Sequence, residues 1–240
     1  MRRLGLVLSL FICFSCETTE TPIPDIGLGY FPLKVGDYQV YSVHETLIDQ
    51  SDSVVFFYEL RLEVIDSIVN LEGEYTYVIQ GQKREDPNLP WVNTDKLTAH
   101  VSNRKAILTE GNTSFAKLMF PAQNGLEWNG NAFNTLGGDQ YCGENKDQPC
   151  DTYRLENVGS KFAAGGVTFD ETVTVVQSEN TDPIVKRDVR SEVYAKGVGL
   201  IYKESVVLEY CTDSKTGCLG QQQVDKGIRY KQVLKEHGSN

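Results

Sequence analysis

Residues 54–64, Val-Val-Phe-Phe-Tyr-Glu-Leu-Arg-Leu-Glu-Val, decide the fold of this chain. The even positions of this stretch are all apolar or aromatic, and the odd positions include Glu59, Arg61 and Glu63. Successive side chains of a strand point to opposite faces of its sheet. The alternation therefore predicts a strand with one face on a core and the other in water.

The same pattern continues on both sides of this strand. Residues 102–104 should close a tight hairpin, whereas residues 114–120 fit a helix turn as well as a strand. About ten strands and no long helix predict an all-β fold. We expect one strongly curved antiparallel sheet that forms an open or closed barrel, with at most short helices; a sandwich is the alternative. The other expected strands cover residues 38–47, 75–80, 96–101, 106–109, 152–157, 167–177, 185–193, a segment ending at 210, and 227–234.

The N-terminus has the pattern of an export signal. Arg2 and Arg3 form a short positive start, and residues 4–14 are an apolar run that Ser15 and Cys16 follow. The run is too short to span a bilayer as a permanent helix, which is typical of a secretory signal. Ser15 directly before Cys16 resembles the lipobox of bacterial lipoproteins. In that family the signal is cleaved before the cysteine, which then carries acyl chains.

This resemblance makes Cys16 the predicted lipidation site and residues 1–15 the signal peptide. The family usually places Leu three residues before the cysteine and a small residue two before, where this chain has Cys13 and Phe14. An ordinary secretory signal is the alternative. Each buried methylene contributes about 0.8 kcal/mol, so two or three acyl chains would anchor the protein stably. The predicted location is the bacterial cell envelope, with a lipid anchor in a membrane facing the periplasm or the cell surface.

The length and net charge of the chain limit the classes of partner that it is expected to bind. The chain has 240 residues and a net charge of −10, which becomes −12 once Arg2 and Arg3 leave with the signal. An acidic surface repels the phosphate backbones of nucleic acids, so we expect no nucleic acid partner. It also repels anionic lipid headgroups, so we expect the acyl chains alone to attach the protein to a membrane. The expected organisation is an acylated cysteine and flexible tether at 16–29, then a single antiparallel β domain at 30–237.

Four cysteines remain beyond the signal and Cys16, and export predicts that they are oxidised. They allow three pairings, of which the local bridges Cys142–Cys150 and Cys211–Cys218 are preferred. A four-cysteine zinc site is the alternative. Paired zinc ligands usually have two to four residues between them, but seven and six residues separate the members of these pairs.

Sequence signatures of catalysis are absent. The chain has no G-x-S-x-G elbow, no H-E-x-x-H helix and no P-loop. His44, His100 and His237 lie far apart in sequence, and a lone strand histidine usually has a structural role. We expect no enzyme, although a hydrolase of envelope polymers would need His44 or His100 beside a second titratable group.

One polar loop around the proposed Cys142–Cys150 bridge could hold calcium, since it offers several hard oxygen ligands. Its spacing differs from the twelve-residue calcium loop, so a loop without metal is preferred, and we expect no cofactor. The candidate ligands are Glu144, Asn145, Asp147 and Asp151.

Three further stretches belong together: Tyr-Phe-Pro-Leu-Lys-Val-Gly at 30–36, Trp-Asn-Gly-Asn at 128–131, and Tyr-Ala-Lys-Gly-Val-Gly-Leu-Ile at 194–201. Jointly they resemble a family of uncharacterised Gram-negative envelope lipoproteins, whose members often carry Trp where this chain has Gln39. The resemblance implies a fold similar to the curved, partly open antiparallel barrels of periplasmic lipid-carrier proteins. It implies no catalytic or binding residues.

The glycines of the last stretch predict a bulge or a tight bend, because Gly197 and Gly199 permit positive φ or a close backbone approach. Tyr194, Val198 and Ile201 beside them are expected in the core rather than in contact with a ligand.

Two interpretations stay open for four aromatic residues, which either contact a ligand or pack in the core. Trp128 could be an exposed binding platform, but a plug for one end of a barrel is favoured, because most aromatic side chains in such domains are core. The four residues are Trp91, Trp128, Phe56 and Tyr58.

Two functions fit this organisation. A non-catalytic structural or interaction role with a protein partner in the envelope requires least of the sequence, and predicts an exposed apolar patch or an open strand edge. The alternative is a carrier or binder of an apolar, lipid-like ligand in the concave face of the sheet. That alternative fails if the even positions of residues 54–62 line a filled core.

Overall fold

The computed structural model describes residues 24–50, 52–71, 73–136, 140–141 and 149–240. The predicted signal peptide, Cys16, Cys142 and most of the predicted calcium loop lie outside these residues, as does the side chain of Cys150. One short 3₁₀ helix, η1 (Leu28–Tyr30), precedes the strands. The strands are β1 (Asp37–Asp49), β2 (Asp52–Val69), β3 (Tyr75–Arg84), β4 (Val92–Val101), β5 (Lys105–Glu110), β6 (Thr113–Met119), β7 (Glu127–Asn129), β8 (Gln140–Tyr141), β9 (Pro149–Cys150), β10 (Thr152–Ala164), β11 (Val167–Asn180), β12 (Lys186–Ala195), β13 (Gly199–Tyr210) and β14 (Val224–Ser239).

Twelve of these strands form one antiparallel sheet in the order β6-β5-β4-β3-β2-β1-β14-β13-β12-β11-β10-β7, and β8 pairs with β9 separately. The two outermost strands approach each other: Ala116 N on β6 donates to Gly130 O just after β7, at 3.0 Å. The sheet is therefore a nearly closed barrel, and the predicted fold class is confirmed.

The alternating stretch lies within β2, which is longer than the stretch itself and pairs with β1 and β3. The hairpin predicted at residues 102–104 joins β4 to β5. Residues 114–120, where the pattern was ambiguous, form most of β6 because they pair with β5 through its whole length. Strand β7 was not predicted, since its three residues are too few to show a period.

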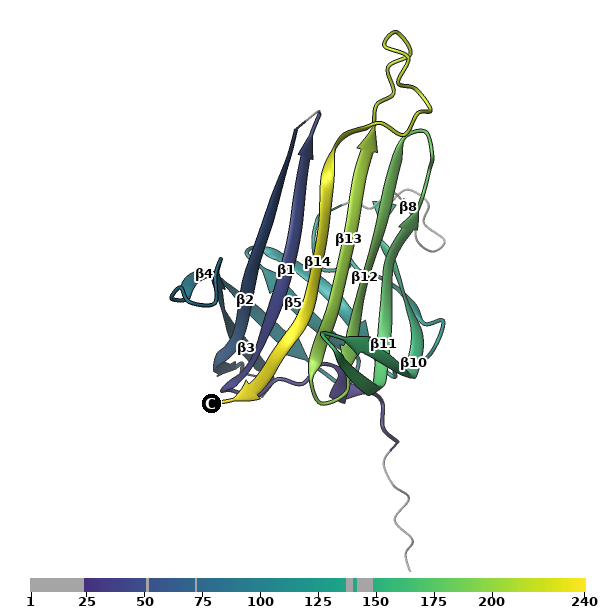
Figure 1. Ribbon diagram of the computed structural model, residues 1–240. Helices are drawn as coiled ribbons and strands as arrows, with labels where there is room; N and C mark the ends of the chain where they lie inside the picture. The colour runs from purple at the N-terminus through teal and green to yellow at the C-terminus, as the bar shows by residue number, and fades with distance from the viewer. Residues whose placement is uncertain (1–23, 51, 72, 137–139, 142–148) are drawn as a thin grey trace, which may run out of the picture.

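The barrel is uneven in height. Figure 1 shows β1, β2, β12, β13 and β14 side by side as a tall wall, whose upper part stands clear of the shorter β3, β4 and β5. Both the start of the described chain and the C-terminus lie at the lower end, where the barrel is closed by strands on all sides. The upper part of the wall therefore extends beyond β3, β4 and β5.

Two glycine positions are required by close approach. Gly199 has φ +94°, and a Cβ there would lie 2.8 Å from Gln39 Nε2. Gly130 lies against the ring of Tyr153, where a Cβ would be 2.3 Å from Cζ. Gly197, with φ +77°, completes the predicted tight bend between β12 and β13.

Residues at the end of the predicted tether contact the barrel. Asp25 forms an ion pair with Lys196 at 2.9 Å, and Gly29 O accepts a hydrogen bond from Gly197 N at 2.7 Å. Residues of the predicted tether therefore contact the bend that follows β12.

Candidate functional site

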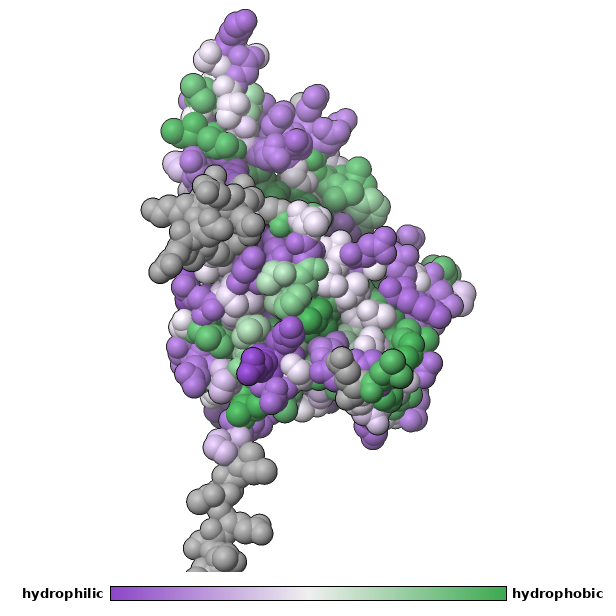
Figure 2. All heavy atoms as spheres, turned by 180° about the vertical axis from the view of Figure 1, so that it is seen from behind, coloured by the Kyte–Doolittle hydropathy of each residue, from purple (hydrophilic) through white to green (hydrophobic). Residues whose placement is uncertain are grey.

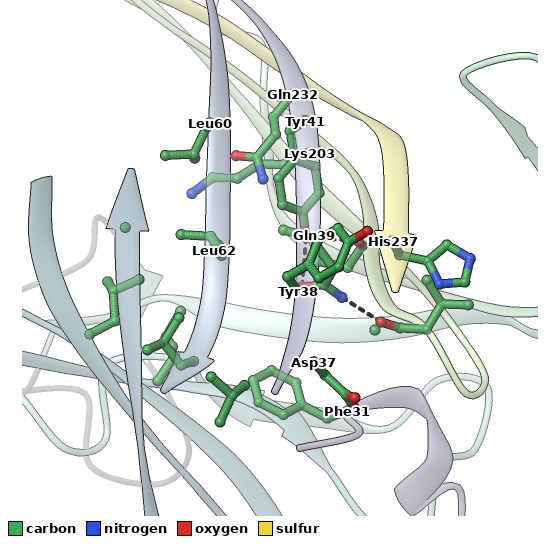
Figure 3. A pocket seen from close by; sticks show the side chains of 18 of the residues that line it. Phe31, Asp37, Tyr38, Gln39, Tyr41, Leu60, Leu62, Lys203, Gln232 and His237 are labelled. Carbon is green, nitrogen blue, oxygen red and sulfur yellow. Dashed lines mark hydrogen bonds between the residues drawn. The ribbon is translucent and has the colours of Figure 1, made fainter. Parts of the chain in front are cut away.

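A cavity of about 410 Å³ lies inside the barrel, between the tall wall and the shorter strands. Its size is typical of pockets that take one small ligand. Figure 3 shows side chains from β1, β2, β13 and β14 converging on this space, with Leu60 and Leu62 on one side and Tyr41 and Lys203 on another. The apolar part of the lining includes Leu60, Leu62, Val64, Ile79, Leu97 and Leu108.

The alternation of β2 explains this apolar wall. Leu60, Leu62 and Val64 share the inward face, and β3 places Ile79 opposite Val64. Leu97 of β4 is in turn opposite Ile79. Each strand contributes its inward apolar positions to the same side of the sheet, so cross-strand pairing builds a continuous apolar surface.

A row of polar side chains crosses the opposite wall. Gln232 of β14 pairs with Lys203 of β13, which pairs with Glu192 of β12. All three line the cavity, and Lys117 reaches them from β6. The cavity thus has an apolar side and a charged side, which is the arrangement of a site that orients an amphiphilic ligand.

Glu192 is the centre of the charged side. Its Oε1 accepts a hydrogen bond from Lys117 Nζ at 2.9 Å, and its Oε2 accepts one from the Tyr194 hydroxyl at 2.6 Å. Lys203 Nζ lies 3.7 Å from Oε1, beyond hydrogen-bond distance. Both oxygens of this buried carboxylate are therefore satisfied without Lys203.

The charges of this cluster stabilise one another. Burial by itself raises the pKa of Glu192, but the positive charges of Lys117 and Lys203 and the hydrogen bond from Tyr194 outweigh burial and lower it to about 2. Burial lowers the pKa of Lys117, but the attraction of Glu192 and Glu110 outweighs it, so this pKa is raised. Burial, followed by the charge of Glu192, raises the pKa of Tyr194. Glu192 and Lys117 stay charged at neutral pH.

A second group of polar contacts lies in the cavity wall beside the bend between β12 and β13. Gln39 Nε2 donates to Val198 O in the bend between β12 and β13. The Tyr41 hydroxyl lies within hydrogen-bond distance of Gln39 Oε1 at 3.1 Å and of Leu200 O at 3.0 Å. Gln39 ties the glycine-containing bend to β1.

Of the residues expected in the core around this bend, Ile201 is buried in it. Tyr194 is also buried, yet it lines the cavity, as Val198 does. Both residues therefore belong to the wall of the cavity as well as to the packing of the barrel.

Trp128 lies at the seam of the barrel. Its indole Nε1 donates to Ala116 O at 2.8 Å, and its ring meets the edge of Tyr153 at 5.9 Å between centroids. It packs against the core and does not line the cavity. Trp128 therefore packs against the core where β6 and β7 approach each other.

The other three aromatic candidates lie apart from the cavity lining. Arg84 stacks on the ring of Trp91 at 4.2 Å. Phe56 and Tyr58 stand on the inward face of β2 above the cavity, where Lys83 Nζ lies 4.0 Å from the centroid of Tyr58. Phe56 is 37% exposed, so the upper positions of the alternating stretch do not line a filled core.

The histidines do not meet at one site. His44 stacks on Phe57 at 4.4 Å, and His100 Nδ1 lies 3.0 Å from Tyr75 O. Only His237 lines the cavity, at its lower mouth. In the part of the chain that the structure describes, no three His, Cys, Asp or Glu side chains gather as a metal site.

Cys211 and Cys218 form a disulfide within the loop between β13 and β14, as their spacing predicts. The predicted Cys142–Cys150 bridge lies outside the described side chains. No helix of the described residues is long and apolar enough to cross a membrane.

Sequence reasoning missed Lys117, Glu192, Lys203 and Gln232. Lys117, Lys203 and Gln232 each share a strand phase with apolar residues, so a polar residue in that phase was the available signal. Glu192 shares its phase with Asp188 and Arg190, so its pattern gave no signal. Lys117 and Glu192 are 75 residues apart, and their pairing depends on closure of the barrel.

A nearly closed antiparallel barrel with an internal, amphiphilic cavity is the class that fold and site define. No protein-family model matches the chain, and no curated protein is similar to it. Similar solved structures include two that each have a TM-score of 0.40 and 13% identity over 87% of this chain and 98% of the other. One is a proposed exported protein with a YmcC-like fold from Bacteroides fragilis, and the other a proposed lipoprotein from Parabacteroides distasonis.

Proposed function

We propose that this protein is a non-catalytic envelope lipoprotein that binds an apolar, lipid-like ligand in the cavity of its barrel. The main support for this proposal is the cavity. Its volume of about 410 Å³ is much larger than the small voids found in a packed protein interior, and much of its lining is apolar. The export signal supports the location, and the barrel supplies the concave face that a carrier requires.

The lipid anchor is part of this proposal. The signal pattern ending at Ser15 makes Cys16 the acylated residue. Cells fed an alkyne analogue of palmitate should label the wild-type protein, and the full-length Cys16→Ser variant should stay unlabelled. Equal labelling of both would exclude Cys16 as the anchor.

Native mass spectrometry of the full-length protein, released from non-ionic detergent micelles, tests ligand binding. A bound mass of lipid size, lost on denaturation, is the expected result. Leu62→Trp should remove it by filling the apolar wall, whereas Ile65→Trp, at an exposed position of the same strand, should not. A wild-type protein without bound mass, and without uptake of added lipid, would contradict the proposal.

A structural or interaction role, which the sequence favoured, is the second candidate, because the upper end of the β1–β2 hairpin is apolar and exposed. Figure 2 shows this apolar surface on the upper part of the molecule. Phe57 is the most exposed of these side chains, at 66%. Exposed apolar patches often mark protein interfaces. The exposed apolar side chains are Leu47, Val54 and Phe56 on one face of the hairpin, and Val55 and Phe57 on the other.

Co-purification after gentle extraction tests this second role. Phe57→Ser should abolish a specific partner and leave the bound ligand unchanged. Loss of the ligand without loss of any partner would favour the carrier role alone.

A further inference from the structure

Lys203 is a cation of the cavity without a hydrogen-bond acceptor. Its side chain is 28% exposed and lines the cavity, and its closest carboxylate oxygen among the described residues is Glu192 Oε1 at 3.7 Å. Its ammonium also lies 5.6 Å from the ring centroid of Tyr230. An ammonium group has three donors, and none of them has an acceptor within hydrogen-bond distance in the described part of the chain.

Glu192 does not need Lys203 as a partner. Lys117 and Tyr194 already satisfy its two oxygens, at 2.9 Å and 2.6 Å. The buried side of the cavity therefore holds two ammonium groups against one carboxylate. Glu110 also approaches Lys117, at 3.9 Å, but its side chain is 42% exposed, so water screens its charge.

Gln232 supplies donors beside Lys203. The two residues are register partners on β14 and β13, and Figure 3 shows them next to each other at the cavity, above Leu62. Gln232 is buried and its Oε1 accepts a hydrogen bond from the Tyr230 hydroxyl at 2.7 Å. Its Nε2 group keeps both donors free of acceptors among the residues that the structure describes.

We propose that the ligand carries a single negative charge on its head group, which Lys203 and Gln232 bind while the apolar tail lies against Leu60, Leu62 and Val64. This inference rests on the proposed ligand-binding function. With one negative charge from the ligand and one from Glu192, two anionic groups balance the ammonium groups of Lys117 and Lys203. A carboxylate, as in a fatty acid, and a phosphodiester, as in a lysophospholipid, both have this charge.

Acidic side chains at the rim of the cavity favour a position for the anionic head group inside the cavity rather than at its mouth. Asp95 and Glu110 line the rim and are exposed and acidic. Water screens these exposed carboxylates, but they still disfavour an anion, which Lys203 attracts. The same acidic rim would attract a cationic head group, which Lys203 would then repel from the interior.

Native mass spectrometry of the full-length protein with added probes tests the inference. The probes are decanoic acid, 1-decanol of the same chain length, and decanoyl lysophosphatidylglycerol. We expect wild type to bind at least one acidic probe about tenfold more tightly than the alcohol, because a hydrogen bond to a charged group contributes about 1.5–3 kcal/mol. The acidic probe that binds more tightly identifies the source of the charge.

Substitutions of Lys203 distinguish the effect of its charge on ligand affinity from the effect of its packing. Lys203→Gln should lower affinity for the acidic probe about tenfold and leave the alcohol unchanged, and Lys203→Arg should retain most of the affinity. Lys231→Gln is the matched control, because Lys231 is exposed and next to Gln232 on the same strand. Its affinity for all probes should equal that of wild type.

Equal binding of acid and alcohol by wild type would overturn the head-group inference and leave the apolar cavity in place. An equal loss for acid and alcohol in Lys203→Gln would also overturn it. If wild type binds none of the probes, the proposed function itself fails. The comparison of acid and alcohol binding by wild type tests the head-group inference even if Lys203→Gln does not fold.

Discussion

Replacing Lys117 with methionine should expose how far the buried ion pair stabilises the barrel. The change keeps an unbranched side chain of similar length but removes the ammonium that lies 2.9 Å from Glu192 Oε1. Glu192 is almost wholly buried and would keep only the Tyr194 hydroxyl and the more distant Lys203. The barrel would then contain a carboxylate with too little compensating charge.

The expected loss is about 3 kcal/mol of unfolding free energy. Removing one partner of a buried ion pair costs about 3–5 kcal/mol, because the remaining charge stays buried. Lys203, 3.7 Å away, offsets part of this cost, which places the estimate at the lower end. Adding Glu192→Gln should recover most of the loss, since the amide removes the charge and its oxygen still accepts from Tyr194.

Urea unfolding followed by tryptophan fluorescence measures this change. Trp128 donates to Ala116, the neighbour of Lys117, so its emission reports on the same region. Lys161→Met is the control, because Lys161 forms an ion pair with Asp170 in which both side chains are exposed; its unfolding midpoint should not move. A loss below about 1 kcal/mol for Lys117→Met, or no recovery in the double variant, would refute the reasoning.

Three other changes have defined outcomes. The folded pKa of Glu192, near 2, lies below its ordinary value of 4.5, so its stabilising contribution is complete above about pH 4.5 and is lost as pH falls toward 2; urea midpoints should fall more with acid in wild type than in Glu192→Gln, in which Glu59 and Asp25, whose pKa values are also lowered, still contribute a loss. Gly130→Ala should cost about 1–3 kcal/mol by thermal unfolding, because its Cβ meets the buried Tyr153 ring; an unchanged midpoint would show that the ring moves aside. Replacing Cys211 and Cys218 together with alanine should cost about 2 kcal/mol, and a reducing agent should lower the wild-type midpoint to that of the variant.

The regular part of the fold could be predicted from local pattern. The alternation of residues 54–64 identified β2, and the turn at 102–104 identified the β4–β5 hairpin. The bend at Gly197 and Gly199 followed from their freedom to take positive φ, which both have. Each of these features depends on residues that are neighbours in the chain.

The ambiguous segments show where local pattern fails. Residues 114–120 are too few to distinguish a helix turn from a strand, and pairing with β5 makes them β6. The two interpretations of Trp128 differ only in what lies across from its ring. Closure of the barrel places Tyr153 and the carbonyl of Ala116 there.

The amino-acid sequence by itself predicted an export signal, and it determined the all-β class and the inward face of clearly alternating strands such as β2, because these depend on composition and on a period of two residues along the chain. Only the tertiary structure decided which inward faces meet. The pairing of Lys117 with Glu192, the unoccupied donors of Lys203 and Gln232, and the apolar wall opposite them all arise from pairing and closure of strands far apart in sequence. A periodic pattern fixes the direction of a side chain within its strand but contains no information about the strand that it will face.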